Sequence, residues 1–460
     1  MKRTPLSLVA HWAGGELTGD DVPVETVTQD TRKLPPGALY VALRGERFDG
    51  HDFAYDAAMR GAGALLVERT LEIDLPQVRV DDTLVALGRI AAGVQRDRQA
   101  RVVAITGSNG KTSVKTLVQS ILQRAGQTYA NPGNFNNEVG LPLAVIDAPE
   151  DAEFAIYEMG AGKPGDIAYL TSIVQPDVAL VNNIAPAHLE RMGTLTGVAE
   201  TKGAILEALA ADGVAVVNAD DAFAEYFVQR AAGRRVIRFG LDSNADVTAR
   251  SVVTMAEGSR FQLLTAQGEL PVRLTLPGRH NVMNALAATA IALACDVPLA
   301  IIADGLEAAR PVAGRQVAHT LAHDVVLIDD SYNANPASLA AAIDTLAMGG
   351  GEAWLVLGDM RELGPEGEAL HAEAGRRAKA AGISRLYALG ALSAAAAQAF
   401  GDGGRVFTSH AELAKALRLD IAGATGTAPA RLLVKGSRGS AMDRIVSALL
   451  DKKGDALHVA

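Results

Sequence analysis

Residues 106–112 read Thr-Gly-Ser-Asn-Gly-Lys-Thr, and this sequence predicts the architecture of the middle of the chain. The apolar run 102–106 predicts a buried strand, and residues 113–123 predict a helix. A glycine-rich turn between a strand and a helix is the context of a phosphate-binding loop. Glycines let backbone N–H groups approach phosphate oxygens, so we expect this loop to bind the phosphates of a nucleotide.

Two side chains of the loop have the chemistry that such a site needs. Lys111 is expected to contact the β- and γ-phosphates, and the Thr112 hydroxyl to ligate Mg²⁺. The usual pattern has glycine where this chain has Ile105, so the loop is a shortened form. A glycine-rich turn with a chance Lys-Thr pair is the alternative, and the strand–loop–helix context argues against it. The residues expected to bind the nucleotide here are Thr106, Gly107, Ser108, Asn109, Gly110, Lys111 and Thr112.

Downstream of the loop, apolar strands alternate with helices. Strands are expected at 154–159, 178–183, 214–218 and 236–239, with helices at 197–210 and 281–294. Such alternation predicts a parallel sheet covered on both faces. Shorter alternating strands over 246–276 predict a small antiparallel patch.

The flanks of this region predict two further α/β units. Residues 1–82 mix short strands with turns, and Asp82 offers an N-cap for the helix that follows. Residues 310–315 break the pattern, and strands then recur at 325–329, 354–357, 385–389 and 431–434. We therefore predict three domains: 1–82, a small α/β domain; 83–313, a central parallel-sheet ATPase domain; and 314–460, a doubly wound Rossmann-like domain.

Composition narrows the functions further. The 460 residues include 43 Lys and Arg against 53 Asp and Glu, a net charge of −10. This balance argues against a dedicated nucleic-acid binder but permits an anionic substrate in a local basic site. The single cysteine, Cys295, excludes an intrachain disulfide and a cysteine-built zinc site. No signal peptide or membrane span is expected, so we predict a cytoplasmic protein.

Ligands of open parallel sheets bind at the carboxyl ends of the strands. Glu158 ends one expected strand and could hold Mg²⁺ directly or through water. His188 follows another strand and is either a second ligand or, more simply, a hydrogen-bonded loop residue. Lys202 lies on the next helix, where the local sequence favours a solvated lysine.

Two polar segments are further candidates for binding sites. Asn281 and Asn284 stand at a helix start, where their amides could cap the helix or read an adenine edge. Residues 329–336, Asp-Asp-Ser-Tyr-Asn-Ala-Asn-Pro, end a strand in a polar loop. They form either a site at the edge of the second sheet or an ordinary Asn/Pro turn.

Six segments together resemble the Mur ligase family. They are TGSNGKT, NFNNEVGLPL (134–143), YEMGA (157–161), NIAPAHLERMG (183–193), GRHNVMNALAA (278–288) and DDSYNANP (329–336). They occur in the family's order and span nearly the whole chain. LGDMRELG (357–364) after DSYNANP resembles the members that add D-alanyl-D-alanine to UDP-N-acetylmuramoyl-tripeptide in peptidoglycan precursor synthesis.

The resemblance implies an ATP-dependent amide ligase. The γ-phosphoryl group of ATP passes to the terminal carboxylate of the tripeptide, and the amino group of D-alanyl-D-alanine attacks the acyl phosphate. Two Mg²⁺ ions are implied, one on Thr112 and Glu158, the other near His188 and a carbamylated Lys202. Lys111, Glu158, His188 and Lys202 are thus the expected catalytic residues.

Other roles follow from the same resemblance. Asn281 and Asn284 are expected to read adenine, Asp330 to hold the ribose, and Arg315 and Lys435 to reach the phosphates. Substrate contacts are expected from Asp30, Thr31 and Arg32 for the uridine nucleotide, from Asn136 and Asn137 for the UDP-sugar side, and from Tyr332, Asn333 and Asn335 for the dipeptide. Since these residues come from different domains, we predict a hinge at 310–315. A monomer is implied.

Two alternatives stay open on sequence alone. One is an amide ligase of the same family that adds a different amine, such as glutamate or diaminopimelate. The other is a nucleotide-binding regulator without catalysis. The presence of Glu158, His188 and Lys202 argues against the regulator, because a binding module needs only the phosphate loop.

Overall fold

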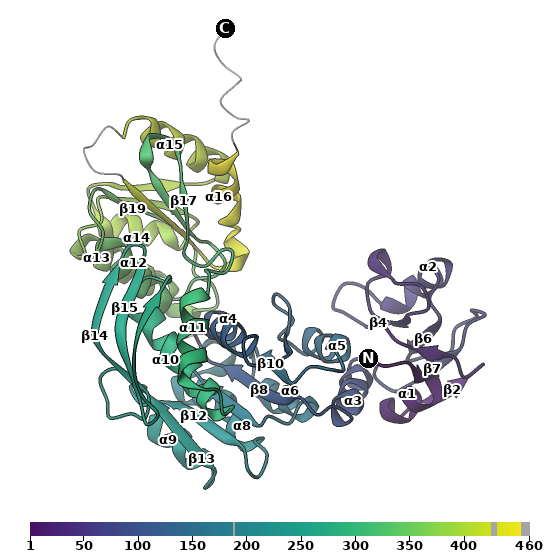
Figure 1. The fold of residues 1–460 in the computed structure, drawn as a ribbon. Coiled ribbons are helices and arrows are strands. Elements are labelled where there is room, and N and C mark those ends of the chain that lie inside the picture. Colours follow the sequence, from purple (N-terminus) through teal and green to yellow (C-terminus); the bar gives the residue numbers. More distant parts are fainter. Residues whose placement is uncertain (187–188, 425–429, 452–460) are drawn as a thin grey trace.

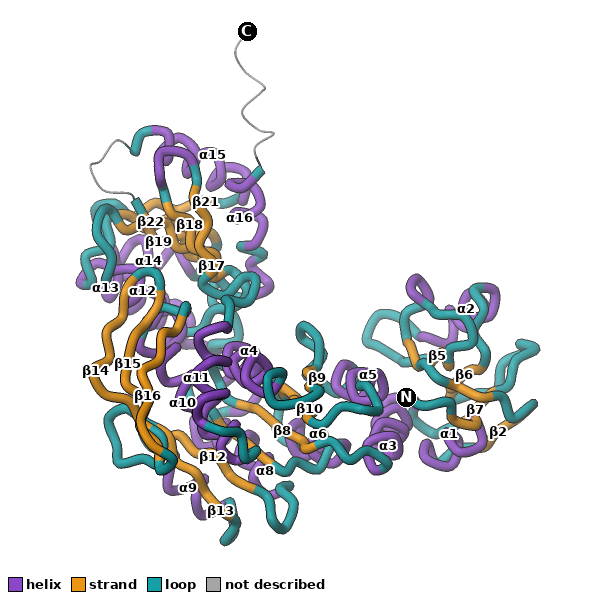
Figure 2. The backbone as a smooth tube through the Cα atoms, viewed as in Figure 1, coloured by secondary structure: helices purple, strands orange, loops and turns teal. Residues whose placement is uncertain are grey.

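The computed structural model describes residues 1–186, 189–424 and 430–451. They form three α/β domains in sequence order, and Figure 1 shows the central domain between the other two. The N-terminal domain has a two-stranded and a five-stranded sheet, the central domain a six-stranded and a three-stranded sheet, and the C-terminal domain a six-stranded sheet. Figure 2 shows the strands of these sheets in orange. Helix α3 (Thr83–Arg96) joins the N-terminal sheet to the central one, and Asp82 caps it by accepting hydrogen bonds from the N–H groups of Leu84 and Val85, as predicted.

The N-terminal domain is built on a five-stranded sheet in the order β2-β7-β6-β5-β4. Strands β4 to β7 are parallel, and β2 pairs antiparallel with β7. Its elements are β1 (Thr4–Pro5), α1 (Leu6–Ala13), β2 (Glu16–Thr18), β3 (Pro23–Val24), β4 (Val27–Thr28), β5 (Leu39–Val41), α2 (Ala54–Met59), β6 (Ala64–Val67) and β7 (Gln77–Arg79).

The central domain has a six-stranded, wholly parallel sheet in the order β13-β12-β11-β8-β10-β9. Its strands are β8 (Arg101–Thr106), β9 (Thr128–Ala130), β10 (Phe154–Glu158), β11 (Val178–Val181), β12 (Val214–Asn218) and β13 (Arg235–Phe239). Its helices are α4 (Lys111–Leu122), α5 (Gly140–Asp147), α6 (Asp166–Ile173), α7 (Leu189–Met192), α8 (Leu195–Glu207), α9 (Ala224–Arg230), α10 (Arg279–Ala294) and α11 (Leu299–Ala308). The predicted antiparallel patch is the sheet of β14 (Thr248–Met255), β15 (Gly258–Thr265) and β16 (Gly268–Leu274).

Both faces of the central sheet are buried, which explains its continuous apolar strands. Val102 and Ala104 of β8 face one core, shared with α3 and α8, whereas Val103 and Ile105 face a second core against α4 and α10. Strand β8 thus lies in the middle of the sheet, so the loop after it opens at the centre of the carboxyl edge.

The C-terminal domain, like the central one, is built on a six-stranded sheet, in the order β17-β18-β22-β19-β20-β21. All neighbours are parallel except β17, an antiparallel edge strand that the sequence analysis missed. Its strands are β17 (Val317–Thr320), β18 (Val326–Asp330), β19 (Ala353–Gly358), β20 (Arg385–Leu389), β21 (Gly404–Phe407) and β22 (Arg431–Lys435). Its helices are α12 (Pro336–Ala347), α13 (Gly367–Ala380), α14 (Ser393–Phe400), α15 (His410–Ala422) and α16 (Asp443–Leu450).

Candidate active site

The phosphate loop connects β8 to α4, and its two glycines have backbone conformations that other residues rarely adopt. Gly107 has φ +153° and Gly110, directly before α4, has φ +79°. A Cβ atom on Gly110 would lie 2.5 Å from Asn284 Oδ1 and 2.6 Å from Asn182 Nδ2. Both the torsion and the crowding therefore demand glycine at position 110.

Amide side chains from the neighbouring strand hold the loop in place. Asn182 and Asn183 follow β11, whose carboxyl end lies beside that of β8. The Asn109 N–H donates to Asn183 Oδ1 at 2.9 Å, and Asn182 Nδ2 donates to the Asn109 carbonyl at 3.0 Å. No role was predicted for Asn182 or Asn183, although they are the last two residues of the strand predicted at 178–183 and so stand at the ligand-binding edge.

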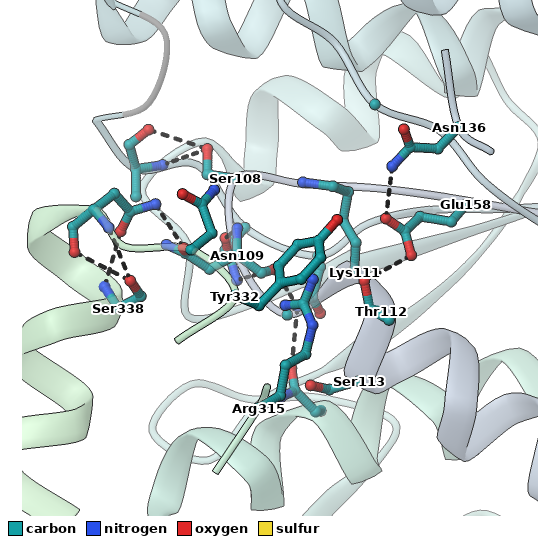
Figure 3. A pocket seen from close by; sticks show the side chains of 18 of the residues that line it. Ser108, Asn109, Lys111, Thr112, Ser113, Asn136, Glu158, Arg315, Tyr332 and Ser338 are labelled. Atoms are coloured by element: carbon teal, nitrogen blue, oxygen red, sulfur yellow. Dashed lines mark hydrogen bonds between the residues drawn. The ribbon is translucent and has the colours of Figure 1, made fainter. Parts of the chain in front are cut away.

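Lys111 points back over the loop. Its Nζ donates to the Gly107 carbonyl at 2.7 Å, and burial lowers the pKa of Lys111, with the charge of Arg315 adding to the effect and that of Glu158 opposing it. A lysine held at the phosphate loop is suited to place positive charge beside a bound triphosphate. Figure 3 shows Lys111 beside Thr112 and Glu158.

Glu158 is the carboxylate of the site. Its Oε2 accepts a hydrogen bond from the Thr112 hydroxyl at 2.8 Å and its Oε1 accepts one from Asn136 Nδ2 at 2.9 Å (Figure 3). Lys115 Nζ lies 3.5 Å from Glu158 Oε2. Burial alone would raise the pKa of Glu158, but Lys115, Lys111 and these hydrogen bonds outweigh it and hold the pKa below its ordinary value. The carboxylate is therefore ionised next to a hydroxyl, and hard oxygen ligands of this kind fit Mg²⁺.

One cavity of about 780 Å³ joins these groups to the C-terminal domain. This volume falls in the usual range of ligand pockets, roughly 300–1,000 Å³. The predicted residues that line it are Ser108, Asn109, Gly110, Lys111, Thr112, Asn136, Asn137, Glu158, Asn281, Asn284, Arg315, Asp330, Tyr332, Asn333, Asn335 and Lys435.

Four residues of the C-terminal half form its opposite wall. Asp330 and Lys435 are buried and joined by an ion pair of 2.6 Å at the ends of β18 and β22. The Arg315 guanidinium stacks on the Tyr332 ring, 4.4 Å from its centre, in front of the phosphate loop (Figure 3). The linker 310–315 and the loop after β18 thus meet at the cavity.

The amides of Asn281 and Asn284 belong to the central domain's own network. Asn284 Nδ2 donates to Asn281 Oδ1 at 3.2 Å, and Asn284 Oδ1 accepts from Asn182 at 3.1 Å. Neither amide caps α10: Asn281 Nδ2 donates to the carbonyl of Pro277 at 2.8 Å, and no side chain caps this helix. The capping interpretation was therefore wrong.

The local interpretation of Lys202 as a solvated helix lysine was also wrong. Lys202 on α8 is only 1% exposed, and its ammonium makes no hydrogen bond or ion pair with another described residue. Burial lowers the pKa of Lys202 well below its ordinary value, and the charge of Lys111 lowers it further. Helical periodicity did carry a signal, because Lys202 lies three or four positions from Val198 and Ala199 and from Ile205 and Leu206, which form the buried face of α8.

The remaining predicted residues lie elsewhere. Asp30, Thr31 and Arg32 follow β4 in the N-terminal domain and do not line the cavity. Asp30 accepts hydrogen bonds from Arg32 Nε at 2.8 Å and Nη2 at 2.9 Å, and this pairing lowers the pKa of Asp30 to about 2. His188 lies outside the described residues.

Two absences bear on the predictions. Within 1–186, 189–424 and 430–451, no three His, Cys, Asp or Glu side chains gather where they could hold a metal ion. The predicted Mg²⁺ ligands also include a threonine and a lysine, which are not among these residue types, so the predicted set stays a prediction. No helix in the same ranges is long and apolar enough to span a membrane.

Three family models match successive parts of the chain. The family model "Mur ligase middle domain" matches residues 105–292, "Mur ligase, glutamate ligase domain" matches 314–438, and "Mur ligase family, catalytic domain" matches 23–109. The chain belongs to the Mur ligase family, as the resemblance indicated, and is an ATP-dependent ligase that forms a carbon–nitrogen bond.

Individual relatives agree along the full length. A UDP-N-acetylmuramoyl-tripeptide–D-alanyl-D-alanine ligase of Escherichia coli is 45% identical over 96% of this chain and 98% of its own. A crystal structure of MurF from Acinetobacter baumannii has a TM-score of 0.92 at 33% identity, covering 98% of this chain and 99% of that one. MurF ligase from Thermotoga maritima in complex with ADP has a TM-score of 0.83 at 27% identity, covering 93% and 97%.

Proposed function

We propose that the protein joins D-alanyl-D-alanine to UDP-N-acetylmuramoyl-tripeptide with the hydrolysis of ATP to ADP and phosphate. The observation that carries the proposal is the shared cavity, in which the phosphate loop and Glu158 face Asp330, Tyr332 and Lys435 of the C-terminal domain. An ATP-dependent ligase needs such a cavity because nucleotide, acid and amine must meet with water excluded. The full-length relatives that bear this substrate name support the same choice.

Each side chain has a role in this reaction. The tripeptide carboxylate attacks the γ-phosphorus of ATP, and ADP leaves as the acyl phosphate forms. The neutral amino group of the dipeptide then attacks the acyl carbon, phosphate leaves as the amide forms, and the nitrogen loses one proton to the leaving phosphate or to solvent. Lys111 and Arg315 would screen the repulsion between the carboxylate and the triphosphate, and the loop amides would hold the phosphates in line.

Two magnesium ions and a modified lysine complete the proposal. Thr112 and Glu158 would hold one ion, because their oxygens already lie 2.8 Å apart and the carboxylate is ionised. The second would bind near His188 and Lys202. Lys202 would carry a carbamate, formed as its neutral amine adds to carbon dioxide and releases a proton; burial and the lowered pKa favour that neutral amine. The ions would supply positive charge that stabilises phosphoryl transfer.

The other predicted residues keep their proposed roles. Asn281 and Asn284 would read adenine, Asp330 hold the ribose and Lys435 approach the phosphates, while Asn136 and Asn137 would face the sugar. Asp30, Thr31 and Arg32 would bind the uridine nucleotide at the carboxyl edge of the N-terminal parallel sheet. Tyr332, Asn333 and Asn335 would face the dipeptide.

The organisation of the chain is part of the proposal as well. The domains divide at 82/83 and 313/314, and the protein acts as a monomer in the cytoplasm, where ATP and nucleotide-linked precursors occur. The linker 310–315 would act as the hinge. Small-angle scattering checks this point: an ATP analogue together with the UDP-tripeptide should compact the protein.

Phosphate release tests the function directly. The assay contains Mg-ATP, UDP-N-acetylmuramoyl-tripeptide and D-alanyl-D-alanine, and each component is omitted in turn. We expect release only with all three, together with a pentapeptide product by mass spectrometry. Release that needs the UDP-tripeptide but ignores D-alanyl-D-alanine would retain the acyl-phosphate chemistry and assign a different amine. No release under any combination would overturn the proposal.

A further inference from the structure

One side chain of the C-terminal domain contacts the phosphate loop directly. Asn335 stands before the first residue of α12, and its Nδ2 donates a 2.7 Å hydrogen bond to Oδ1 of Asn109 in the phosphate loop. The two residues are 226 positions apart and belong to different domains. Figure 3 shows the start of α12, marked by Ser338, beside Asn109.

The Asn335 amide is already oriented by its own helix. Its Oδ1 accepts the Ser338 N–H at 2.9 Å, and Ser338 Oγ accepts the Asn335 N–H at 3.1 Å, so the pair forms a capping box. Since the oxygen is used by the cap, the NH₂ group must face outward, toward Asn109. One side chain thus fixes the start of α12 and reaches the loop.

Asn109 is equally constrained on its side. Its N–H donates to Asn183 Oδ1, and its carbonyl accepts from the amides of Asn182 and Asn183 at 3.0 and 3.2 Å. With both backbone groups held by the central domain, its side chain makes the contact across the domains. A shift of α12 therefore acts on the loop backbone through this one bond.

The loop that carries Asn335 is also tied to the linker. The Tyr332 N–H donates to the Gly314 carbonyl at 3.1 Å, and Arg315 stacks on the Tyr332 ring. Residues 330–335 therefore contact the linker through Tyr332 and the phosphate loop through Asn335.

We propose that Asn335 is a positioning residue that couples the phosphate loop to the C-terminal domain through Asn109. The proposal rests on the proposed function only in taking ATP or ADP as the nucleotide. Asn335 keeps the loop in the shape that binds phosphates when the C-terminal domain is docked. Loss of the Asn335 amide weakens nucleotide binding although the fold and the helix cap stay intact.

The test replaces the amide by a group that still caps. Asn335→Ser keeps an uncharged side chain whose oxygen is a good N-cap acceptor. The serine side chain is too short to reach Asn109. A hydrogen bond between neutral groups is worth a factor of about two to ten in an equilibrium constant. Isothermal titration of Mg-ADP should therefore show affinity about fivefold weaker. In turnover, KM for ATP should rise by more than kcat falls.

A matched control separates positioning from stability. Ser409 caps α15 in the same domain by accepting the Glu412 N–H at 3.3 Å, and it does not line the cavity. Ser409→Ala should lower the melting temperature with no change in ADP affinity. Asn335→Ser should weaken ADP binding and leave the melting temperature unchanged.

A double-mutant cycle completes the test. Asn109→Ser alone should weaken ADP binding, and adding Asn335→Ser should weaken it by less than a further twofold, because the bond is already lost. The proposal is overturned if Asn335→Ser alone binds ADP within twofold of the wild type, or if the two effects multiply. ADP binding needs no peptide substrate, so a wild-type protein that binds ADP but fails to join the dipeptide would overturn the proposed function alone.

Discussion

Asp330 and Lys435 are register partners at the carboxyl ends of the adjacent parallel strands β18 and β22, and Lys435 Nζ lies 2.6 Å from Asp330 Oδ2. Both side chains are buried, and Lys435 also donates to the Asn333 carbonyl at 3.0 Å. Burial raises the pKa of Asp330, while the Lys435 ammonium acts against it. This pair fixes the end of the second sheet that faces the nucleotide cavity.

Removal of one partner should destabilise the C-terminal domain. Lys435→Met leaves a buried carboxylate without its cation, which costs about 3 kcal/mol in the free energy of unfolding near neutral pH. The loss should shrink at acid pH, because a protonated Asp330 needs no counter-ion. Urea unfolding at neutral and at acid pH measures the two losses. Lys415 is an exposed lysine of α15, and the control Lys415→Met should change the free energy of unfolding by less than about 0.5 kcal/mol. An equal loss at neutral and acid pH would contradict this account.

Lys111→Ala should abolish turnover and preserve the fold. The ammonium is held above the loop by the Gly107 carbonyl, and burial already disfavours its charged form, so the folded protein loses little without it. We expect kcat to fall by at least about 100-fold, since the lysine offsets charge that develops in phosphoryl transfer. Phosphate release and circular dichroism are the two measurements. Retained ligation would remove Lys111 from the mechanism.

The sequence predicted five of the six strands of the central sheet to within two residues, because buried parallel strands are short continuous apolar runs. It missed the edge strand β9, which has only three residues, all of them half-buried. It also predicted the glycine-rich loop, which follows β8, and the position of Glu158 at the end of β10. It could not predict the order of the strands, which places β11 beside β8 and so brings Asn182 and Asn183 to the loop. That order depends on packing between distant segments.

The two errors have different origins. The charge of lysine favoured a solvated position, although the helical spacing of Val198, Ile205 and Leu206 puts Lys202 on the buried face of α8, where it is among the largest fully buried side chains. The hydrogen bond from Asn335 to Asn109 could not be predicted from the sequence. Asn-Ala-Asn-Pro predicts a turn and a helix start, but it does not predict which residue of another domain the turn contacts. Contacts between domains leave no periodic trace in either segment.

Lys202→Ala should lose activity that short carboxylates or bicarbonate partly restore. Burial lowers the pKa of Lys202 and so favours the neutral amine, which is the form that reacts with carbon dioxide, and a small carboxylate can enter the space that alanine leaves. Ligation assays with added acetate or formate measure the rescue. A carbamate carbon signal in ¹³C NMR of the wild-type protein supplied with labelled bicarbonate is an independent readout. Full activity of the variant without rescue would make Lys202 an ordinary buried lysine.

His280 should stay neutral throughout the working range of the enzyme. It lies on the first turn of α10 and lines the cavity. Burial lowers the pKa of His280 to about 4, the charge of Lys435 adds to this, and a hydrogen bond with Gln316 and the charge of Asp344 oppose it. An NMR titration of the His280 ring should therefore have its midpoint near that value. A midpoint at the ordinary 6.5 would contradict this prediction.

The same shift predicts how the free energy of unfolding changes with pH. The unfolded chain binds the His280 proton more tightly than the folded protein, because its pKa is 6.5 rather than about 4. The stabilisation from neutral His280 is thus fully present above pH 6.5 and is lost as the pH falls toward about 4. The His280→Gln variant should not show this decrease in the free energy of unfolding at acid pH. His11 is an exposed residue of α1, and the His11→Gln variant should still show the decrease because His280 is intact. Urea unfolding at about pH 7.5 and about pH 5 decides the point, and equal slopes for wild type and His280→Gln would contradict it.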